Sequence, residues 1–245
     1  MKIALLGTGK MGQAIEAKAI AAGHEIVLRI NASNLQELTE EHLKKADVVI
    51  EFSRPDAVVE NLMKCLDAGL PVVCGTTGWH EDYNKVSSIF LEKGGALLSA
   101  TNFSVGVNLL FQLNIELAKW MNRFPEYTPA IEEIHHTRKL DKPSGTAVTL
   151  AMGIIEQSPK INSWKLREDD TIVAENDLLI DARRESNVIG IHEVTWTSPI
   201  DNISIRHEAF NRDGFATGAL IAAEWIIGKK GVFGMNDLLF SKQNL

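Results

Sequence analysis

The stretch that decides the expected fold is KIALLGTGKMG at residues 2–12. Its first half is an apolar run with the length of a strand that is buried on both faces of a sheet. Gly7, Gly9 and Gly12 then form the pattern G-x-G-x-x-G between that strand and a stretch of helical period. In this context the first glycine permits a tight turn, the second lets the backbone approach a pyrophosphate, and the third lets the helix pack close to the strand. The stretch predicts a dinucleotide-binding domain, and the alternative is merely a tight strand-to-helix turn.

The same alternation of apolar runs and helical stretches continues through the first hundred residues. The apolar runs have the length of buried strands, and three of the helical stretches end on a glycine, as helices often do. Alternating strands and helices predict a doubly wound parallel sheet. The apolar runs lie at 2–7, 25–30, 47–53, 70–76 and 96–103, and the helical stretches at 10–23, 34–46, 55–69 and 81–95.

After Ser104 the pattern changes to a long apolar helix followed by long strands joined by turns, which predicts a second, largely antiparallel sheet. The expected fold class is therefore α/β: an N-terminal Rossmann-type doubly wound parallel sheet, and a smaller α+β domain with an open mixed or antiparallel sheet. We place the first domain at 1–104, completed by a C-terminal helix within 214–245, and the second at 105–213. In the second domain, strands are expected at 129–137, 176–185, 187–199 and 202–210, and a helix from Ser144 to about Gln157.

Composition and charge narrow the range of partners. The 245-residue chain has a formal net charge of −7, so it has no general attraction to nucleic acid or to anionic membranes. Cys65 and Cys74 are its only cysteines, and their lack of a pairing pattern fits a reducing compartment. The chain opens on a strand-like run rather than a signal peptide, and no apolar run is long enough to cross a membrane. We expect a cytoplasmic protein whose local basic clusters serve small anions.

The end of the second predicted strand bears on the choice of cofactor. Asn31 stands where an acidic residue usually holds the ribose hydroxyls of a dinucleotide, and Arg29 precedes it by two positions, on the same side of an extended strand. A neutral amide does not repel a 2′-phosphate as a carboxylate does, so NADPH is permitted as well as NADH. The alternative is that Arg29 is a solvated surface residue and that the site binds NADH loosely.

Two further loops are expected at the same edge of the sheet, because they also follow the ends of parallel strands. The segments EFSRPDA and CGTTGW place Phe52, Ser53 and Arg54 in one loop and residues 75–78 in the other. Glycines and small hydroxylated residues offer backbone N–H groups and little bulk, which suits a nicotinamide ribose or amide. Ordinary turn chemistry is the alternative for each loop taken singly.

The segment EEIHHTRKLDKPSGTAVTLA at 132–151 concentrates basic side chains in an acidic protein. On a strand, His135 shares a face with Glu133, whereas His136 points to the opposite face, so the two histidines cannot share one role. Ser144 is a natural N-cap for the following helix, and we expect the free N–H groups of Ser144, Gly145 and Thr146 to receive a carboxylate or phosphate. With Lys139 nearby, the segment predicts an anion site.

A structural interpretation of the same segment stays open. Ser144 then only caps the helix, Lys139 and Arg138 are solvated, and the histidines make hydrogen bonds within the sheet. A metal site is not expected, because adjacent histidines cannot easily bind one ion and no cysteine or carboxylate joins them at a useful spacing.

The chain resembles the dihydrodipicolinate reductase family, also called 4-hydroxy-tetrahydrodipicolinate reductase, in five motifs that recur in the same order: GTGKMG, FSRPDA, CGTTGW, ATNFSVGVN and EIHHTRKLDKPSGTA. The resemblance covers essentially the whole chain. It implies an enzyme of diaminopimelate and lysine biosynthesis that uses NADPH or NADH and acts on a small dicarboxylate. It also implies a second domain whose sheet binds substrate and builds a homotetramer. Asn31 departs from the acid often found at that position, which leaves the cofactor preference open.

The resemblance carries roles to particular residues. His135 and Lys139 match the catalytic histidine and lysine of the family, and His136, Lys139, Ser144, Gly145 and Thr146 match the positions that hold substrate carboxylates. With Arg29 and Asn31, the expected cofactor residues are Gly7, Thr8, Gly9, Lys10, Met11, Gly12, Phe52, Ser53, Arg54, Gly75, Thr76, Thr77, Ala100, Thr101, Asn102 and Phe103.

For a cyclic imine substrate, hydride addition at C4 leaves an enamine that must gain a proton at C3. We expect His135 to provide this proton and Lys139 to act chiefly as an electrostatic anchor, although the sequence does not settle the division. It also leaves open whether the enzyme expels water from a hydroxylated precursor. Two rival functions are another two-domain Rossmann dehydrogenase and a non-catalytic NAD(P)H sensor.

Overall fold

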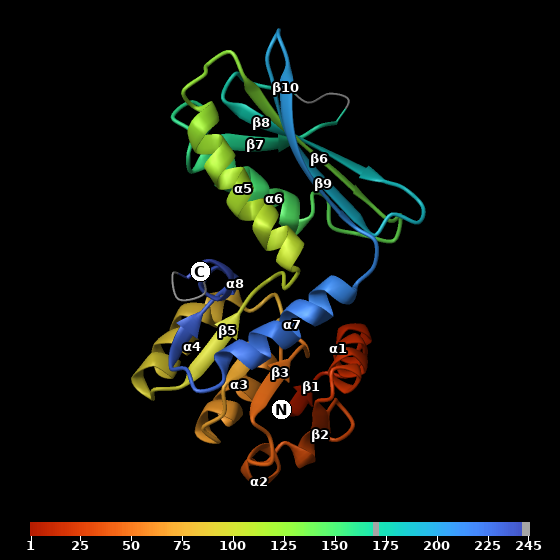
Figure 1. Cartoon of the computed structure of the whole chain (residues 1–245), viewed down its shortest axis with the longest axis vertical. Coiled ribbons are helices and arrows are strands. Elements are labelled where there is room, and N and C mark those ends of the chain that lie inside the picture. Colours follow the sequence, from red (N-terminus) through yellow and green to blue (C-terminus); the bar gives the residue numbers. More distant parts are fainter. Residues whose placement is uncertain (169–171, 242–245) are drawn as a thin grey trace. The chain divides into compact units, whose positions relative to one another are not determined.

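The structure is a computed structural model, and it describes residues 1–168 and 172–241 of the chain. The chain forms two compact units (Figure 1). The first unit takes the chain up to Val105 and again from Asp213 onwards, and the second comprises Gly106–Arg212. The C-terminal segment therefore returns to the unit in which the chain begins.

The first unit is built on a six-stranded sheet in which every neighbouring pair of strands is parallel. The strand order is β11-β5-β4-β3-β1-β2. Five of the strands fall within the predicted apolar runs, which confirms the doubly wound parallel sheet. The sixth, β11, was not predicted, since its three residues are too few to show a pattern. The bounds are β1 Lys2–Leu6, β2 Glu25–Ile30, β3 Val48–Glu51, β4 Val72–Cys74, β5 Ala96–Ser99 and β11 Gly231–Phe233.

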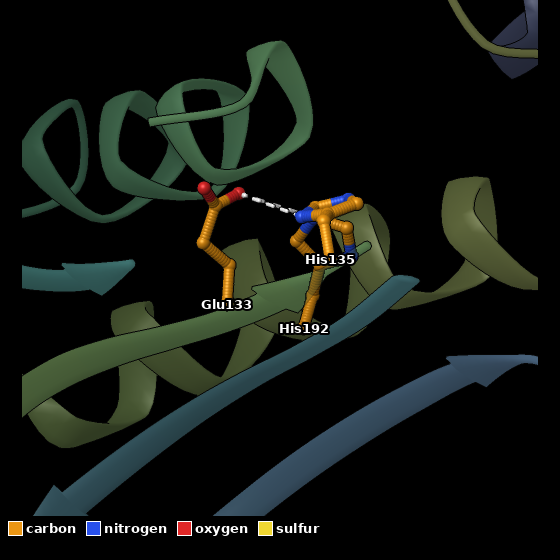
Figure 2. A group of neighbouring side chains, drawn as sticks. All are labelled: Glu133, His135 and His192. Atoms are coloured by element: carbon orange, nitrogen blue, oxygen red, sulfur yellow. Dashed lines mark ion pairs between the residues drawn. The ribbon is translucent and has the colours of Figure 1, made fainter. Parts of the chain in front are cut away.

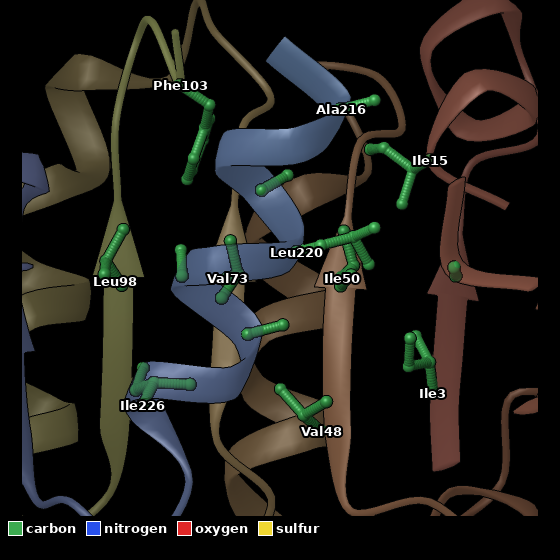
Figure 3. Packing of buried hydrophobic residues seen from close by; sticks show 14 of the residues in the cluster. Ile3, Ile15, Val48, Ile50, Val73, Leu98, Phe103, Ala216, Leu220 and Ile226 are labelled. Carbon is green, nitrogen blue, oxygen red and sulfur yellow. The ribbon is translucent and has the colours of Figure 1, made fainter. Parts of the chain in front are cut away.

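Helices cover both faces of this sheet. The cluster that contains α1 and α7 packs on one face, where Ile15 and Leu220 meet strand residues such as Ile50 (Figure 3). The helices α2, α3 and α4 contribute to the cluster on the other face. Each fully buried Leu or Ile contributes ~1.5–3 kcal/mol, so these two clusters are the main stabilising feature of the unit. The bounds are α1 Lys10–Ala21, α2 Glu40–Leu43, α3 Val58–Asp67, α4 His80–Glu92, α7 Asp213–Ile226 and α8 Met235–Phe240.

The predicted helix at 34–46 is wrong. The structure has a 3-10 turn, η1 Leu35–Glu37, and then the short helix α2. The side chain of Asn34 accepts a hydrogen bond from the Asn31 backbone and donates to the Arg29 carbonyl, which holds the start of the segment in a turn. Thr39 then starts a new helix by accepting from the backbone N–H of His42. Polar side chains that bond to the nearby backbone compete with a continuous helix.

The second unit contains a five-stranded mixed sheet in the order β10-β9-β6-β8-β7. The central strand β6 is antiparallel to β9 and parallel to β8, and β7 is also parallel to β8. The expectation of a mixed sheet is therefore confirmed, and the stronger expectation of a largely antiparallel sheet is correct only for the β10-β9-β6 side. The four-residue strand β7 was not predicted. The bounds are β6 Thr128–His135, β7 Ser163–Leu166, β8 Asp177–Arg184, β9 Gly190–Thr197 and β10 Asn202–Ala209.

Two helices, α5 Val105–Met121 and α6 Gly145–Ile155, supply the helical side of the hydrophobic core in the second unit. Leu110 and Leu150 pack in one buried cluster with strand residues such as Ile131. The side chains of β6 alternate between this core and a more exposed face, as expected for a strand covered on one side. Among the described residues, no helix is long and apolar enough to span a membrane.

Candidate cofactor and catalytic sites

The glycine-rich turn between β1 and α1 has room for a ligand only at its middle glycine. Gly7 has φ +96°, and a Cβ there would lie 2.1 Å from the carbonyl oxygen of Phe52. A Cβ on Gly12 would lie 2.0 Å from the Gly7 carbonyl oxygen, so only glycine lets α1 pack against the turn. A Cβ on Gly9, which precedes α1, would meet no atom within 4 Å. The open space therefore lies in front of a helix N-terminus, where a diphosphate is favoured.

The loops that follow β3, β4 and β5 converge at the carboxyl end of the same sheet. A Cβ on Gly75 would lie 2.2 Å from the aromatic ring of Phe52, so the β4 loop lies against the β3 loop. The ring centroids of Phe52 and Phe103 are 5.5 Å apart, which brings in the loop after β5. These loops and the glycine-rich turn also contain Thr8, Lys10, Met11, Ser53, Arg54, Thr76, Thr77, Ala100, Thr101 and Asn102.

Arg29 is not a free cation beside Asn31. Its guanidinium Nη2 and Nε lie 2.7 and 2.8 Å from the Glu16 carboxylate on α1. The side chain of Asn31 accepts hydrogen bonds from the backbone N–H and the hydroxyl of Ser33 at 2.8 and 2.6 Å. Arg29 is thus paired with a carboxylate of the same unit, and a contact between Arg29 and a 2′-phosphate stays a prediction.

The second candidate site is built around Glu133 on β6. Glu133 and His135 both lie on the buried face of this strand, as the alternation in the sequence predicts. The register of the sheet brings His192 of β9 opposite Glu133 and Arg184 of β8 opposite His135. Figure 2 shows the Glu133 carboxylate directed toward the two imidazole rings.

Glu133 is fully buried and has several polar partners. Its carboxylate accepts the backbone N–H of Ser144 at 3.0 and 3.1 Å, and both Nη atoms of Arg184 lie 3.3 Å from Oε1. The nitrogens His135 Nδ1 and His192 Nε2 lie 3.6 and 3.7 Å from Oε2. Burial by itself raises the pKa of Glu133, but the contacts from His192 and Ser144 outweigh it and lower the pKa to about 2. Glu133 is therefore a carboxylate at neutral pH.

His135 is held in an environment that disfavours its protonated form. Burial, followed by the neighbouring His192, lowers the pKa of His135 to about 4, although Glu133 opposes the shift. The two imidazole rings meet edge to face with centroids 4.9 Å apart. A Cβ on Gly190 would lie 3.1 Å from His135 Nε2, so this glycine leaves space for the ring. In the free protein His135 is neutral at neutral pH.

Ser144 caps α6 as predicted, but its own N–H group is not free. Its hydroxyl accepts from the backbone N–H of Ala147 at 3.2 Å, which is the expected N-cap bond. Its backbone N–H is already bonded to Glu133, and the binding of a ligand carboxylate at Ser144 stays a prediction. Within the described ranges, no acceptor is bonded to the backbone N–H groups of Gly145 and Thr146. These two groups remain available for an anion.

Lys139 lies close to this site through the loop between β6 and α6. Its ammonium is 2.8 Å from the carboxylate of Asp141 in the same loop. Arg184 donates to the backbone carbonyls of Lys139 and Asp141 as well as to Glu133. Arg184 therefore fixes the loop that carries Lys139 to the buried carboxylate. A substrate carboxylate at Lys139 has to share the ammonium with Asp141 or displace it.

His136 lies outside this cluster. It lines a cavity of about 570 Å³ together with Arg138, Asn187, Phe210 and Arg212. The structure thus brings His135, Lys139, Ser144 and the N-terminus of α6 together around Glu133, and it places His136 elsewhere. The sequence predicts such a separation for consecutive strand residues, and in the structure His136 is the residue that follows the end of β6.

Reasoning from the sequence did not place Glu133, His192 and Arg184 in the candidate site. The local signal for Glu133 was its position two residues before His135 on the same face. His192 and Arg184 enter the site only through the pairing of β9 and β8 with β6, which the sequence does not reveal. One ligand atom from each of Glu133, His135 and His192 lies within 4.8 Å of the others, a spacing that fits a metal ion. The Arg184 guanidinium beside Glu133 opposes a cation, so the absence of a metal stays our prediction.

The comparison with known proteins covers both units. The family model described as the N-terminus of dihydrodipicolinate reductase matches residues 1–103, and that for its C-terminus matches residues 106–239. A 4-hydroxy-tetrahydrodipicolinate reductase from Christiangramia forsetii is 46% identical over 241 residues, which is 98% of each chain. One from Pelagibacter ubique is 34% identical and covers 96% of this chain and 92% of the relative.

Solved structures confirm the fold. A dipicolinate-bound dihydrodipicolinate reductase from Paenisporosarcina sp. TG-14 superposes with a TM-score of 0.77 at 23% identity, covering 98% of this chain and 99% of that chain. An apo scyllo-inositol dehydrogenase from Lactobacillus casei gives a TM-score of 0.52 at 12% identity, covering 98% and 88%.

The parallel sheet with its glycine-rich turn and the second mixed sheet define a two-domain protein of the Rossmann class. Within that class, the two family models and the relative with 46% identity show that the chain belongs to the dihydrodipicolinate reductase family.

Proposed function

We propose that the protein reduces the dihydrodipicolinate-type cyclic imine, formed from 4-hydroxy-tetrahydrodipicolinate, to tetrahydrodipicolinate with NADPH or NADH, in diaminopimelate and lysine biosynthesis. Besides family membership, one observation carries the proposal. The buried Glu133 carboxylate holds Ser144 at the N-terminus of α6 and lies 3.6 Å from His135 Nδ1. An anion-binding helix end and an imidazole are thereby fixed on either side of one carboxylate.

The substrate carboxylates are bound by the N-terminus of α6 and by Lys139. The N–H groups of Gly145 and Thr146 point out of the first turn of the helix, and a Cβ on Gly145 would meet no atom within 4 Å. The helix end and a lysine cation together favour a negative group at this place. A carboxylate held there draws electron density from the conjugated ring system, which favours addition of hydride to C4.

The proton for C3 comes from His135. Because burial holds the pKa of His135 at about 4, the imidazole is neutral before the substrate binds. The two carboxylates of the substrate add negative charge beside it, which raises its pKa and lets it take up a proton. His135 then donates that proton to the enamine carbon, and Lys139 remains the electrostatic anchor. Glu133 stabilises the imidazolium from behind.

The turn between β1 and α1 fits a nicotinamide dinucleotide, which supplies the hydride when bound. The open space at Gly9 lies before the N–H groups of Lys10 and Met11, where a diphosphate is favoured. Asn31 does not repel a 2′-phosphate, but Arg29 is paired with Glu16 and gives it no free cation. We infer that NADH is bound at least as well as NADPH.

The homotetramer and the cytoplasmic location stay predictions. We propose that the tetramer forms through the sheet face of the second unit that is not covered by α5 and α6, which carries Ala130 of β6 and Ser204 of β10. Light scattering on the purified protein measures the mass in solution, and a monomeric mass would contradict this assembly.

A coupled assay tests the proposed function. Supplied with the product of dihydrodipicolinate synthase, the protein should oxidise NADH, NADPH or both at a rate well above background. No oxidation with either cofactor would exclude the reductase and leave a sensor role as the remaining interpretation. The use of a different substrate would favour another Rossmann dehydrogenase instead.

A further inference from the structure

The first unit contains a second fully buried carboxyl group, Glu51, at the last position of β3. The partners of this group are neutral donors. Its Oε1 accepts from the backbone N–H and the hydroxyl of Ser53 and from Nδ2 of Asn61, and its Oε2 accepts from the Thr76 hydroxyl at 2.6 Å and from Cys74 Sγ at 3.6 Å. A buried carboxyl costs free energy unless its oxygens are satisfied. Here the donors come from the loop after β3, the loop after β4, helix α3 and the end of β4.

The side chain of Glu51 joins the loop after β3 to the loop after β4. One oxygen contacts Ser53 in the first loop, and the other contacts Thr76 in the second. The backbone of the β3 and β4 strands is already paired, but that pairing ends at Glu51 and Cys74. Beyond it, the Gly75 N–H donates to the Glu51 carbonyl at 2.9 Å and Gly75 lies against the Phe52 ring, and the Glu51 carboxyl adds hydrogen bonds to both loops.

Glu51 also sets the hydrogen-bonding character of Ser53. A hydroxyl has one hydrogen, and the Ser53 hydroxyl donates it to Glu51. The same hydroxyl oxygen lies 3.2 Å from the donor Nδ2 of Asn61. The Ser53 hydroxyl oxygen therefore keeps one unused lone pair, and the residue is only half-buried. Ser53 can therefore only accept a hydrogen bond from a bound molecule.

The sheet order indicates which part of the cofactor meets this acceptor. The strands run β4-β3-β1-β2, with the open helix N-terminus after β1 and Asn31 after β2. A dinucleotide whose diphosphate lies at the β1 turn and whose adenosine ribose lies near Asn31 extends its other half toward β3 and β4. That half carries hydrogen-bond donors, namely ribose hydroxyls and a carboxamide, whereas a diphosphate offers acceptors only.

We propose that Glu51 is a positioning residue for the nicotinamide half of the cofactor: it locks the two loops together and turns Ser53 into an acceptor. The inference rests on the proposed use of a nicotinamide dinucleotide. It adds a residue that does not touch the ligand and that acts through Ser53 and Thr76. ADP lacks the nicotinamide half of the cofactor. Variants of Glu51 should therefore weaken the binding of NADH and leave the binding of ADP almost unchanged.

The experiment measures the dissociation constants of NADH and ADP for the full chain by titration calorimetry, without substrate. Glu51→Leu should weaken NADH binding by ~10-fold or more, the equivalent of one or two lost hydrogen bonds, and change ADP binding by less than about twofold. Glu51→Gln should weaken NADH binding less than Glu51→Leu does. The remaining side-chain oxygen can accept from Ser53 and Asn61, and the new amide can donate to Thr76. Glu92→Gln, at an exposed position on α4, is the matched control and should bind like the wild type.

Equal weakening of NADH and ADP would show a general loosening of the unit and overturn the proposal, as would unchanged binding of both. If Glu51→Leu does not fold, Ser53→Ala gives the same test. Weaker binding of NADH with unchanged binding of ADP supports the proposal, and an unchanged ratio of the NADH and ADP dissociation constants overturns it. Failure of the wild type to bind either nucleotide would refute the cofactor site itself. Failure confined to the variants would leave the proposed function intact.

Discussion

The backbone N–H of Ser144 donates to both carboxylate oxygens of Glu133, at 3.0 and 3.1 Å. This contact ties the N-terminus of α6 to the middle of the sheet in the second unit. It also explains why a buried carboxylate lies on the hydrophobic face of β6, since a charge there is tolerated when it is paired and hydrogen-bonded.

Removal of the Glu133 carboxylate should destabilise the second unit and disturb the anion site together. Glu133→Ala leaves Arg184 and the Ser144 N–H without their buried acceptor, which we expect to cost about 3 kcal/mol or more of unfolding free energy. The neighbouring Glu132 pairs with Arg183 and is partly exposed, so Glu132→Ala should cost less than about 1 kcal/mol. Urea denaturation of the two variants measures both values, and equal costs would contradict the special position of Glu133.

The second unit should lose stability as the pH falls. Between pH 6.5 and about 4 the unfolded chain takes up a proton at His135 that the folded protein does not, because folding lowers the pKa of His135. Between pH 4.5 and about 2 the same is true of Glu133. The stabilisation from both groups is therefore complete above pH 6.5. Thermal melts of His135→Gln should show a smaller decline in the upper part of this range, where His207, whose pKa is also lowered by burial, still contributes. The exposed His80→Gln should behave like the wild type, and an identical decline in His135→Gln would refute this explanation.

Lys139 should matter for turnover and little for stability. In its pair with Asp141 the carboxylate is exposed and the lysine only partly exposed, and pairs that solvent reaches contribute about 0–1 kcal/mol. Lys139→Ala should lower turnover by ~10²-fold, because the substrate loses a cation that stabilises developing charge. The melting temperature should be almost unchanged. Lys142→Ala, in the same loop and exposed, is the control. An equal loss of turnover in both variants would show that the general charge of the loop matters, not Lys139.

Removal of the Glu16 charge should shift the cofactor preference of the protein toward NADPH. In the wild type this carboxylate neutralises Arg29, so Glu16→Gln frees a cation next to the position expected for a 2′-phosphate. We expect the KM for NADPH to fall roughly threefold or more, whereas the KM for NADH stays the same. Glu25→Gln removes an exposed carboxylate from β2, the strand that carries Arg29, and serves as the control. A parallel change for both cofactors would contradict the role given to the Glu16–Arg29 pair.

The pH dependence of catalysis separates His135 from Lys139 as the proton donor. Since kcat/KM reports the free enzyme, it should decline as the pH rises from 5 to 8 if His135 is the acid, because the protonated fraction falls above a pKa of about 4. The decline in kcat should begin at higher pH, since the bound carboxylates raise the pKa. A level kcat/KM over this range would assign the proton to Lys139.

Local patterns in the sequence predicted much of the fold and part of the site. The alternation of apolar runs gave five of the six strands in the first sheet, and strand periodicity placed Glu133 and His135 on one face. The N-cap at Ser144 followed from residue type and position. Such features depend on neighbours in the sequence, which is why they can be predicted.

Features that depend on contacts between distant segments could not be predicted. His192 and Arg184 reach Glu133 through the register of three strands, and Glu133 occupies the Ser144 N–H that we expected to be free. Arg29 meets Glu16 because α1 packs beside β2. The short strands β7 and β11 form because a neighbouring strand offers free backbone groups, not because their own sequences favour them.

His135, the last residue of β6, should carry out proton transfer, and His136, which follows the strand, should not. The most direct measurement compares the kcat of His135→Gln and His136→Gln at saturating NADH and substrate. We predict a fall of ~10² or more for His135→Gln with an intact fold, and a much smaller fall for His136→Gln, whose effect should appear in KM. Near-normal kcat in His135→Gln, or equal losses in both variants, would contradict the role assigned to His135.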